Sequence, residues 1–284
     1  MKTLLFLYAA AGTLCLSQGA NLSAAQQFYD RTEYDKAIQA LQPEGSQEVS
    51  VLTLAAKSYL KLDDYKKAAE LLERAIEKEP KQSVLHHLLG KSYGRRAENS
   101  SLFTAGRWAS KCRQSFEKAV ELDPRNIEAM SDLMEYYIEA PGIMGGGMDK
   151  AAAMAARIGK LDPVEFHHAQ ARLSEKNKDY KTAEKHLRAA ADLAPRTIGY
   201  ILDLAKFLAR HDRVQESDAA FQRAAGISPD APKLLFDQAQ AYVQNRRNLA
   251  EARKLLERFL SSRLTPEDPP KAQAESLLKQ ATGT

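Results

Sequence analysis

The chain has 284 residues, and its 41 lysines and arginines against 37 aspartates and glutamates give a formal net charge of +4. Hydrophobic residues make up 44% of the sequence and charged residues 27%, a composition that excludes collagen-like, mucin-like, disordered and multi-span membrane proteins. Two cysteines are too few for a disulfide-stapled scaffold, and the small net charge gives no indication of a nucleic-acid partner.

The first twenty residues have the pattern of a targeting segment. Lys2 precedes an uncharged stretch over residues 3–16, and small residues follow in Ser17-Gln18-Gly19-Ala20. A basic start, an apolar core and a small-residue exit are typical of a secretory signal peptide. We therefore expect residues 1–20 to be a signal peptide and the protein to be exported, either periplasmic or secreted. Retention of the segment as an anchor helix stays open, and no later segment approaches membrane-spanning length.

Residues 21–267 repeat one pattern of small, bulky and proline positions. In the clean stretches the spacing is 34 residues, as between Tyr59 and Tyr93, Ala183 and Ser217, and Pro195 and Pro229. Within a unit, apolar residues at i, i+3, i+4 and i+7 predict a first helix, and a small residue on a second helix lets the two axes approach closely. A proline then ends the unit. One such unit cannot bury its apolar face alone, so the pattern predicts stacked helix pairs.

The best copy of this pattern covers residues 49–82. Its eight signature positions hold Leu52, Ala55, Ala56, Tyr59, Ala68, Leu72, Ala75 and Pro80. This copy resembles the tetratricopeptide repeat (TPR), and the resemblance extends over nearly the whole chain after residue 20, as in exported bacterial TPR proteins. It implies an all-α fold, a right-handed α-α superhelical solenoid of about seven helix pairs over residues 21–267. A capping helix and tail are expected over residues 268–284, opened by proline.

Two copies carry insertions, within residues 94–108 and 140–148, which we expect to project from one edge of the stack. The glycine-rich insertion lacks the hydroxyl residue and the preceding strand of a phosphate loop. A sharp turn after Pro141 is one interpretation, and a docking loop for a partner is another. The residues of the candidate docking loop are Pro141, Ile143, Met144, Gly145, Gly146, Gly147 and Met148. Trp108 is expected to pack on an extended second helix.

No set of residues supports catalysis, a metal or a cofactor. Adjacent histidines such as His167 and His168 point about 100° apart on a helix, and a single Glu165/His168 pair is only half of a di-iron site. Cys112 occupies a small-residue position of the repeat, where a buried, inert thiol is expected. We therefore expect a protein that is not an enzyme.

The concave face of the predicted stack is rich in basic residues. In this repeat family, positions 2, 5, 9, 12 and 13 of the first helix line the groove, and eight of the twelve residues at positions 9 and 13 of copies two to seven are Lys or Arg. Helix C-termini favour cations, which accounts for part of the bias at position 13. With two histidines at position 5, the candidate groove residues are Lys57, Lys61, His87, Lys91, Arg95, His168, Arg172, Lys176, Lys206 and Arg210.

This groove predicts a non-catalytic scaffold or adaptor that binds another protein, such as an acidic extended peptide. The alternative is a small-ligand-binding accessory protein of an envelope transport system. The alternative predicts a closed, apolar pocket in place of an open, charged groove.

Overall fold

The computed structural model describes residues 21–283, which divide into two compact units. Unit 1 comprises residues 21–136 and 140–146, and unit 2 comprises residues 137–139 and 147–283. The expected signal peptide, residues 1–20, lies outside the described residues. Across the part of the chain that is described, every helix is too short or too polar to traverse a lipid bilayer.

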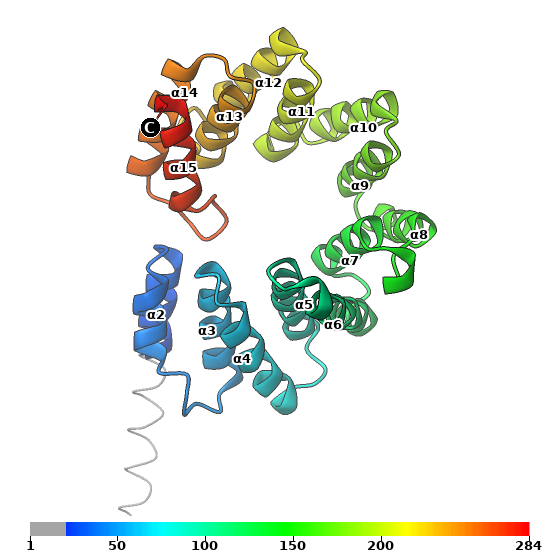
Figure 1. The fold of residues 1–284 in the computed structure, drawn as a ribbon, viewed down its shortest axis with the longest axis vertical. Coiled ribbons are helices and arrows are strands. Elements are labelled where there is room, and N and C mark those ends of the chain that lie inside the picture. The colour runs from blue at the N-terminus through cyan, green and yellow to red at the C-terminus, as the bar shows by residue number, and fades with distance from the viewer. Residues whose placement is uncertain (1–20, 284) are drawn as a thin grey trace, which may run out of the picture. The chain divides into compact units, whose positions relative to one another are not determined.

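Unit 1 is built from antiparallel helix pairs, as Figure 1 shows. Helical residues 21–30 pair with α2 (Tyr34–Leu41), and this pair is the first of the helix pairs expected over residues 21–267. Next come α3 (Val49–Lys61) and α4 (Tyr65–Lys78), then α5 (Ser83–Glu98) and α6 (Leu102–Leu122). Helix α7 (Ile127–Glu139) begins in unit 1 and ends in unit 2, and the short 3-10 helix η1 (Gly142–Met144) follows it.

Unit 2 continues the same alternation of helices (Figure 1). Its helices are α8 (Met148–Gly159), α9 (Pro163–Lys176), α10 (Tyr180–Leu193), α11 (Ile198–Arg210), α12 (Val214–Ile227), α13 (Pro232–Gln244) and α14 (Leu249–Ser261). The last helix is α15 (Lys271–Thr282), which begins after Pro270 and packs on α13 and α14. It is the helix expected at the end of the chain.

The signature positions of the repeat form the buried core of each pair. In the pair α3/α4, Leu52, Ala68 and Leu72 are fully buried, and Tyr59 is 8% exposed. A small residue on the second helix allows close approach of the axes, and the larger side chains fill the space beside it. The described residues contain no strand, so the predicted all-α helix-repeat fold is confirmed.

The turn between the two helices of a pair has a recurring backbone geometry. At least one residue adopts a left-handed conformation in the turn of each of five pairs, namely Thr32, Asp63, Lys178 and Asp212 in four of them and both Arg246 and Asn248 in the fifth. After Lys178, the amide of Asp179 donates to the carbonyl of Ser174 at 2.9 Å, which closes the end of α9 in a Schellman-type turn. The Asp179 carboxylate then accepts the Thr182 amide at 3.1 Å and caps α10. The turn therefore ends one helix and starts the next within three residues.

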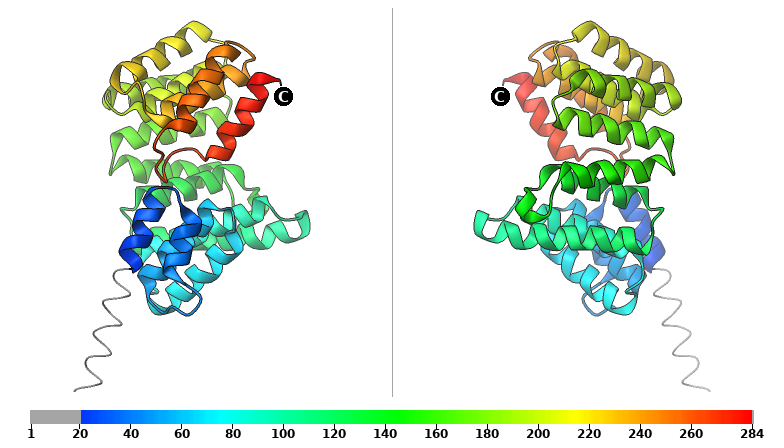
Figure 2. Two further views of the ribbon diagram at one scale, coloured as in Figure 1. Left: turned by 90° about the vertical axis from the view of Figure 1, so that its left-hand side faces the viewer. Right: turned by 90° about the vertical axis from the view of Figure 1, so that its right-hand side faces the viewer.

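The insertion within residues 94–108 lengthens α5 and α6 into one long hairpin. Figure 2 shows this hairpin reaching beyond the shorter helices of unit 1. The Trp108 ring stacks on Tyr93 with centroids 5.6 Å apart, and the Arg96 guanidinium lies 3.5 Å from the centre of the indole. Trp108 therefore lies on the extended second helix, as the sequence predicts, and packs against the first helix, which holds the two helices of the hairpin together.

Candidate functional site

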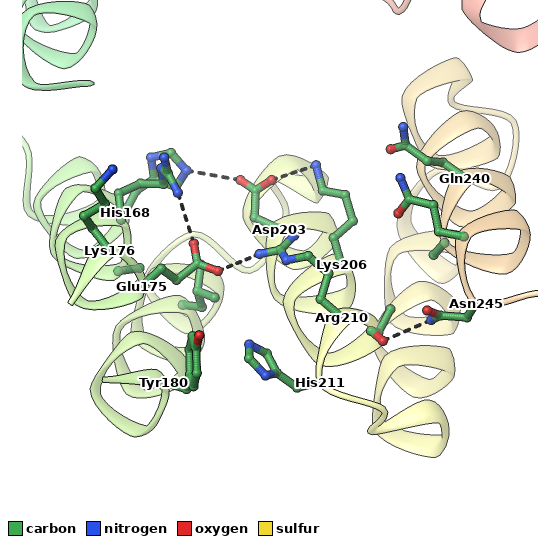
Figure 3. A pocket seen from close by; sticks show the side chains of 16 residues that line it. His168, Glu175, Lys176, Tyr180, Asp203, Lys206, Arg210, His211, Gln240 and Asn245 are labelled. Atoms are coloured by element: carbon green, nitrogen blue, oxygen red, sulfur yellow. Dashed lines mark hydrogen bonds and ion pairs between the residues drawn. The ribbon is translucent and has the colours of Figure 1, made fainter. Parts of the chain in front are cut away.

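Unit 2 carries an open hollow of about 720 Å³ on the side where the first helices of its pairs lie (Figure 3). Most of its lining comes from α9, α11 and α13, the first helices of three successive copies. Five of the candidate groove residues line it, namely His168, Arg172, Lys176, Lys206 and Arg210. We call this the unit-2 hollow.

Asp203 is the centre of the charge arrangement in the unit-2 hollow. Its carboxylate lies 3.4 Å from His168 Nε2 and 3.1 Å from Lys206 Nζ, as Figure 3 shows. Lys206 also reaches Asp237 on α13 at 3.2 Å, and the Asp237 side chain is only 5% exposed. A chain of opposite charges thus links α9, α11 and α13 side by side.

These pairings shift the pKa values of the groups involved. Burial acts to raise the pKa of the Asp203 carboxyl, but the hydrogen bond from His168 and the charge of Lys206 outweigh burial and hold the pKa at about 2. The same hydrogen bond raises the pKa of His168 above its ordinary value of 6.5, against the opposing effect of burial. Asp203 is therefore ionised at neutral pH, and it favours the protonated form of His168.

The remaining candidate cations of unit 2 also have carboxylate neighbours. Arg210 lies 2.6 Å from Glu175, and Lys176 lies 2.8 Å from Glu139 of the preceding copy. Arg172 lies 3.4 Å from Glu175. The unit-2 hollow is therefore a surface of balanced charge, although the predicted groove residues do come together in it.

The candidate groove residues in the later copies of unit 1 are paired as well. His87 is 4% exposed and contacts Asp132 at 2.6 Å, so its ring is not accessible to a partner. Lys91 lies 3.8 Å from the same aspartate, and Arg95 lies 2.8 Å from Glu98.

The acidic partners of these cations are not among the residues predicted from the sequence. Asp132, Asp203 and Asp237 occupy the sixth position of the first helix in three copies. This position is not among those assigned to the groove. The signal was present in the sequence as an aspartate that recurs at one position of the repeat. In the structure this aspartate contacts a basic residue of the same copy or of the preceding copy.

Lys57 differs from the other candidate cations. It is half-buried on α3, and within residues 21–283 its ammonium makes no ion pair. It lines a second hollow, of about 730 Å³, between helical residues 21–30 and α3 in unit 1. We call this the unit-1 hollow. Besides Lys57 its lining includes one carboxylate, Glu79, and the amides and hydroxyls of Ser23, Gln26, Gln27, Ser50, Thr53 and Gln82.

The candidate docking loop has a defined conformation with one apolar side chain held outward. Gly145 has φ of 89°, and a Cβ on Gly146 would lie 1.8 Å from the Ala140 carbonyl oxygen, so both positions require glycine. The Tyr136 hydroxyl donates to the Met144 carbonyl at 2.9 Å and fixes the turn. Ile143 is 94% exposed at the tip.

Cys112 is buried at 3% exposure in the packing between α5 and α6. Burial raises the pKa of its thiol to about 12, so the thiolate is nearly absent at neutral pH. The predicted burial of this thiol is confirmed. Among the described residues, no group of three or more metal-ligating side chains comes together.

A tetratricopeptide repeat model matches residues 49–92, which contain the best copy identified in the sequence. Human antiviral innate immune response effector IFIT1 is 27% identical over 176 residues, which cover 55% of this chain and 36% of IFIT1. The chain therefore spans about a third of that relative's length.

Several solved structures have a similar fold. A tetratricopeptide repeat protein from Parabacteroides merdae superimposes with a TM-score of 0.60 at 14% identity, covering 94% of this chain and 99% of its own. A thermophilic TPR protein from Thermus thermophilus gives 0.56 at 19% identity, covering 67% and 98%. The human IFIT1 dimer with PPP-AAAA gives 0.55 at 21% identity, covering 84% and 54%. The model match identifies a tetratricopeptide repeat over residues 49–92, and the similar structures show that the chain has the fold of tetratricopeptide repeat proteins.

Proposed function

We propose that the protein is a non-catalytic adaptor that binds an extended, acidic segment of another protein in the unit-1 hollow. Lys57 carries this proposal, because it is a half-buried cation in an open hollow and no carboxylate of the described chain pairs with it. A carboxylate of the partner would form a charge-assisted hydrogen bond with the ammonium. The surrounding amides and hydroxyls can bond to the backbone of an extended peptide.

The paired cations of the unit-2 hollow are poorer candidates for the same role. A partner carboxylate that approached Lys206 would have to displace Asp203 or Asp237, which lie 3.1 and 3.2 Å from its ammonium. Displacement costs each aspartate one of its two counter-ions, since only His168 then stays beside Asp203 and only Lys233 beside Asp237. The acidic segment should therefore bind first at Lys57.

The polar character of both hollows favours the adaptor over a small-ligand carrier. A carrier of small apolar ligands needs an enclosed apolar pocket. Both hollows are open, and polar side chains outnumber apolar ones in each lining, although Leu22, Val49 and Leu54 add apolar surface to the unit-1 hollow. A carrier of an envelope transport system therefore remains the second proposal, and a metabolite that raises the melting temperature would favour it.

The proposal places the adaptor outside the cytoplasm. Its support is the sequence of residues 1–20 alone, with a basic start, an uncharged stretch and a small-residue exit. Amino-terminal sequencing of the protein recovered from the envelope or the medium would test this point. We expect the recovered protein to begin near Asn21. Recovery of the full chain from the cytoplasm would oppose export.

The binding proposal is tested by comparing the peptide affinities of two variants, Lys57→Glu and Lys78→Glu. Lys78 is exposed and lies outside the unit-1 hollow, so its replacement makes the same change in charge away from the proposed site. The probes are fluorescent ten-residue peptides rich in Asp and Glu with free carboxyl termini. We expect Lys57→Glu to weaken binding by about tenfold or more, since one charge-assisted bond contributes about 1.5–3 kcal/mol. Lys78→Glu should have little effect. Equal binding by both variants would oppose the proposal, as would tighter binding of an RNA oligonucleotide.

We also propose that Ile143 makes a second contact with the partner. An apolar side chain held at 94% exposure on a fixed turn is suited to enter a pocket of another protein. Ile143→Ser should weaken capture of a full-length partner, once identified, and leave the melting temperature unchanged. Unchanged capture by this variant would remove the loop from the interface.

A further inference from the structure

Two histidine rings meet between α9 and α10 in unit 2. His167 Nδ1 and His186 Nδ1 lie 2.8 Å apart, and the ring centroids are separated by 5.1 Å. In the sequence His167 stands next to His168, which points elsewhere on the same helix. The structure instead brings His167 together with a histidine 19 residues later, on the next helix.

The contact places two potential metal ligands face to face. At 2.8 Å one nitrogen must donate a proton and the other must accept it, so a single proton lies between two lone pairs. Imidazole nitrogen is a preferred ligand of Zn²⁺, Cu²⁺ and Ni²⁺. An ion in this position replaces the shared proton as the link between the two rings.

The separation of the rings is close to the one that a bound ion requires. With Zn–N bonds of about 2.0–2.1 Å and tetrahedral angles, two ligating nitrogens lie about 3.4 Å apart. The two nitrogens therefore need to separate by about 0.6 Å, and each half-buried ring needs to turn so that its lone pair points at the ion instead of at the other ring. The Phe166 ring lies 5.5 Å from the His167 ring and 6.3 Å from the His186 ring, so it flanks both.

The geometry points to a two-histidine site for a divalent transition-metal ion, formed by His167 and His186, with water completing the coordination. Both rings are partly exposed, so water can reach the ion. No third protein ligand joins them among the described residues, and Lys185 is a nearby cation. The site is therefore a weak, exchangeable one that cross-links α9 to α10.

The test is calorimetric titration of the untagged protein with ZnCl₂, comparing wild type with His167→Ala, His186→Ala and the control His86→Ala. His86 is a half-exposed histidine of α5 that contacts the Pro80 carbonyl. We expect one ion per chain in wild type and in the control. A residue that only hydrogen-bonds to a metal ligand contributes about 10–100-fold to metal affinity. Removal of a ligand itself should therefore lower the Zn²⁺ affinity of each ligand variant by at least about tenfold.

A second measurement on wild type covers the case in which a variant fails to fold. Imidazole NMR signals of His167 and His186 should both shift on addition of ZnCl₂, while those of His86 stay in place. Absence of Zn²⁺ binding to wild type would overturn the proposal. Binding that persists in both ligand variants, or that shifts other histidines instead, would do the same.

Discussion

At the scale of single residues, the main feature of this protein is how its groove cations are paired. Lys206 contacts Asp203 and Asp237, while Lys57 contacts no carboxylate in the described chain. Composition and repeat position alone cannot distinguish the two lysines, since both occupy position 9 of a first helix. Their environments differ because the aspartate at the sixth position is present in some copies and absent from others.

The His168–Asp203 contact should make stability depend on pH in a defined direction. The folded pKa of His168 is raised above 6.5 by Asp203, so this contribution to the free energy of unfolding is fully present below about pH 6.5. It is lost as the pH rises through the raised folded value. Glu165 and Arg172 also face the ring, with opposite effects on its charge.

We therefore expect His168→Asn to destabilise the protein by about 0.2–1 kcal/mol at pH 6, the range of partly exposed ion pairs, and by less at pH 9. Urea unfolding at the two pH values measures the difference. Asp203 stays ionised throughout this window, since its pKa is about 2. A wild-type advantage that grows from pH 6 to pH 9 would contradict this assignment.

At the scale of the helix pair, the sequence was sufficient to predict which residues are buried. Leu52, Ala68 and Leu72 lie in the core because their spacing puts them on the facing sides of two adjacent helices. The same spacing could not predict which way the longer polar side chains turn. The contact of His167 with His186 depends on ring orientation across two helices, and no repeat position encodes it.

The backbone approach at Gly90 gives a test of this packing. A Cβ on Gly90 of α5 would lie 2.4 Å from the Phe116 ring of α6, and that ring also lies against the buried His87. Gly90→Ala should therefore lower the free energy of unfolding by about 1–3 kcal/mol, the range for overpacked cores.

The matched control is Gly226→Ala on α12. This glycine is exposed and has open space where its Cβ would lie. Its replacement should be neutral or raise stability by up to about 1 kcal/mol, because alanine favours the helix. Thermal unfolding of both variants gives the comparison. Equal effects would mean that α5 and α6 do not pack as closely as described.

At the scale of the whole molecule, the chain is two units in which helices contact mainly their neighbours in chain order. Such a fold can be predicted from sequence because each repeat has the same local pattern of apolar and small residues. The fold class follows from that repetition, and the long hairpin with Trp108 follows from an insertion that interrupts it. The charge of each hollow cannot be predicted from the repeat, because it depends on which polar residue each copy carries at the positions that do not pack in the core.

Amide hydrogen exchange tests whether an acidic partner segment binds in unit 1 at Lys57. Exchange is followed in the full chain with and without the acidic peptide that binds most tightly. We expect slower exchange over helical residues 21–30 and over α3, the two segments that supply most of the lining of the unit-1 hollow. Protection confined to α9, α11 and α13, with unit 1 unchanged, would contradict the claim.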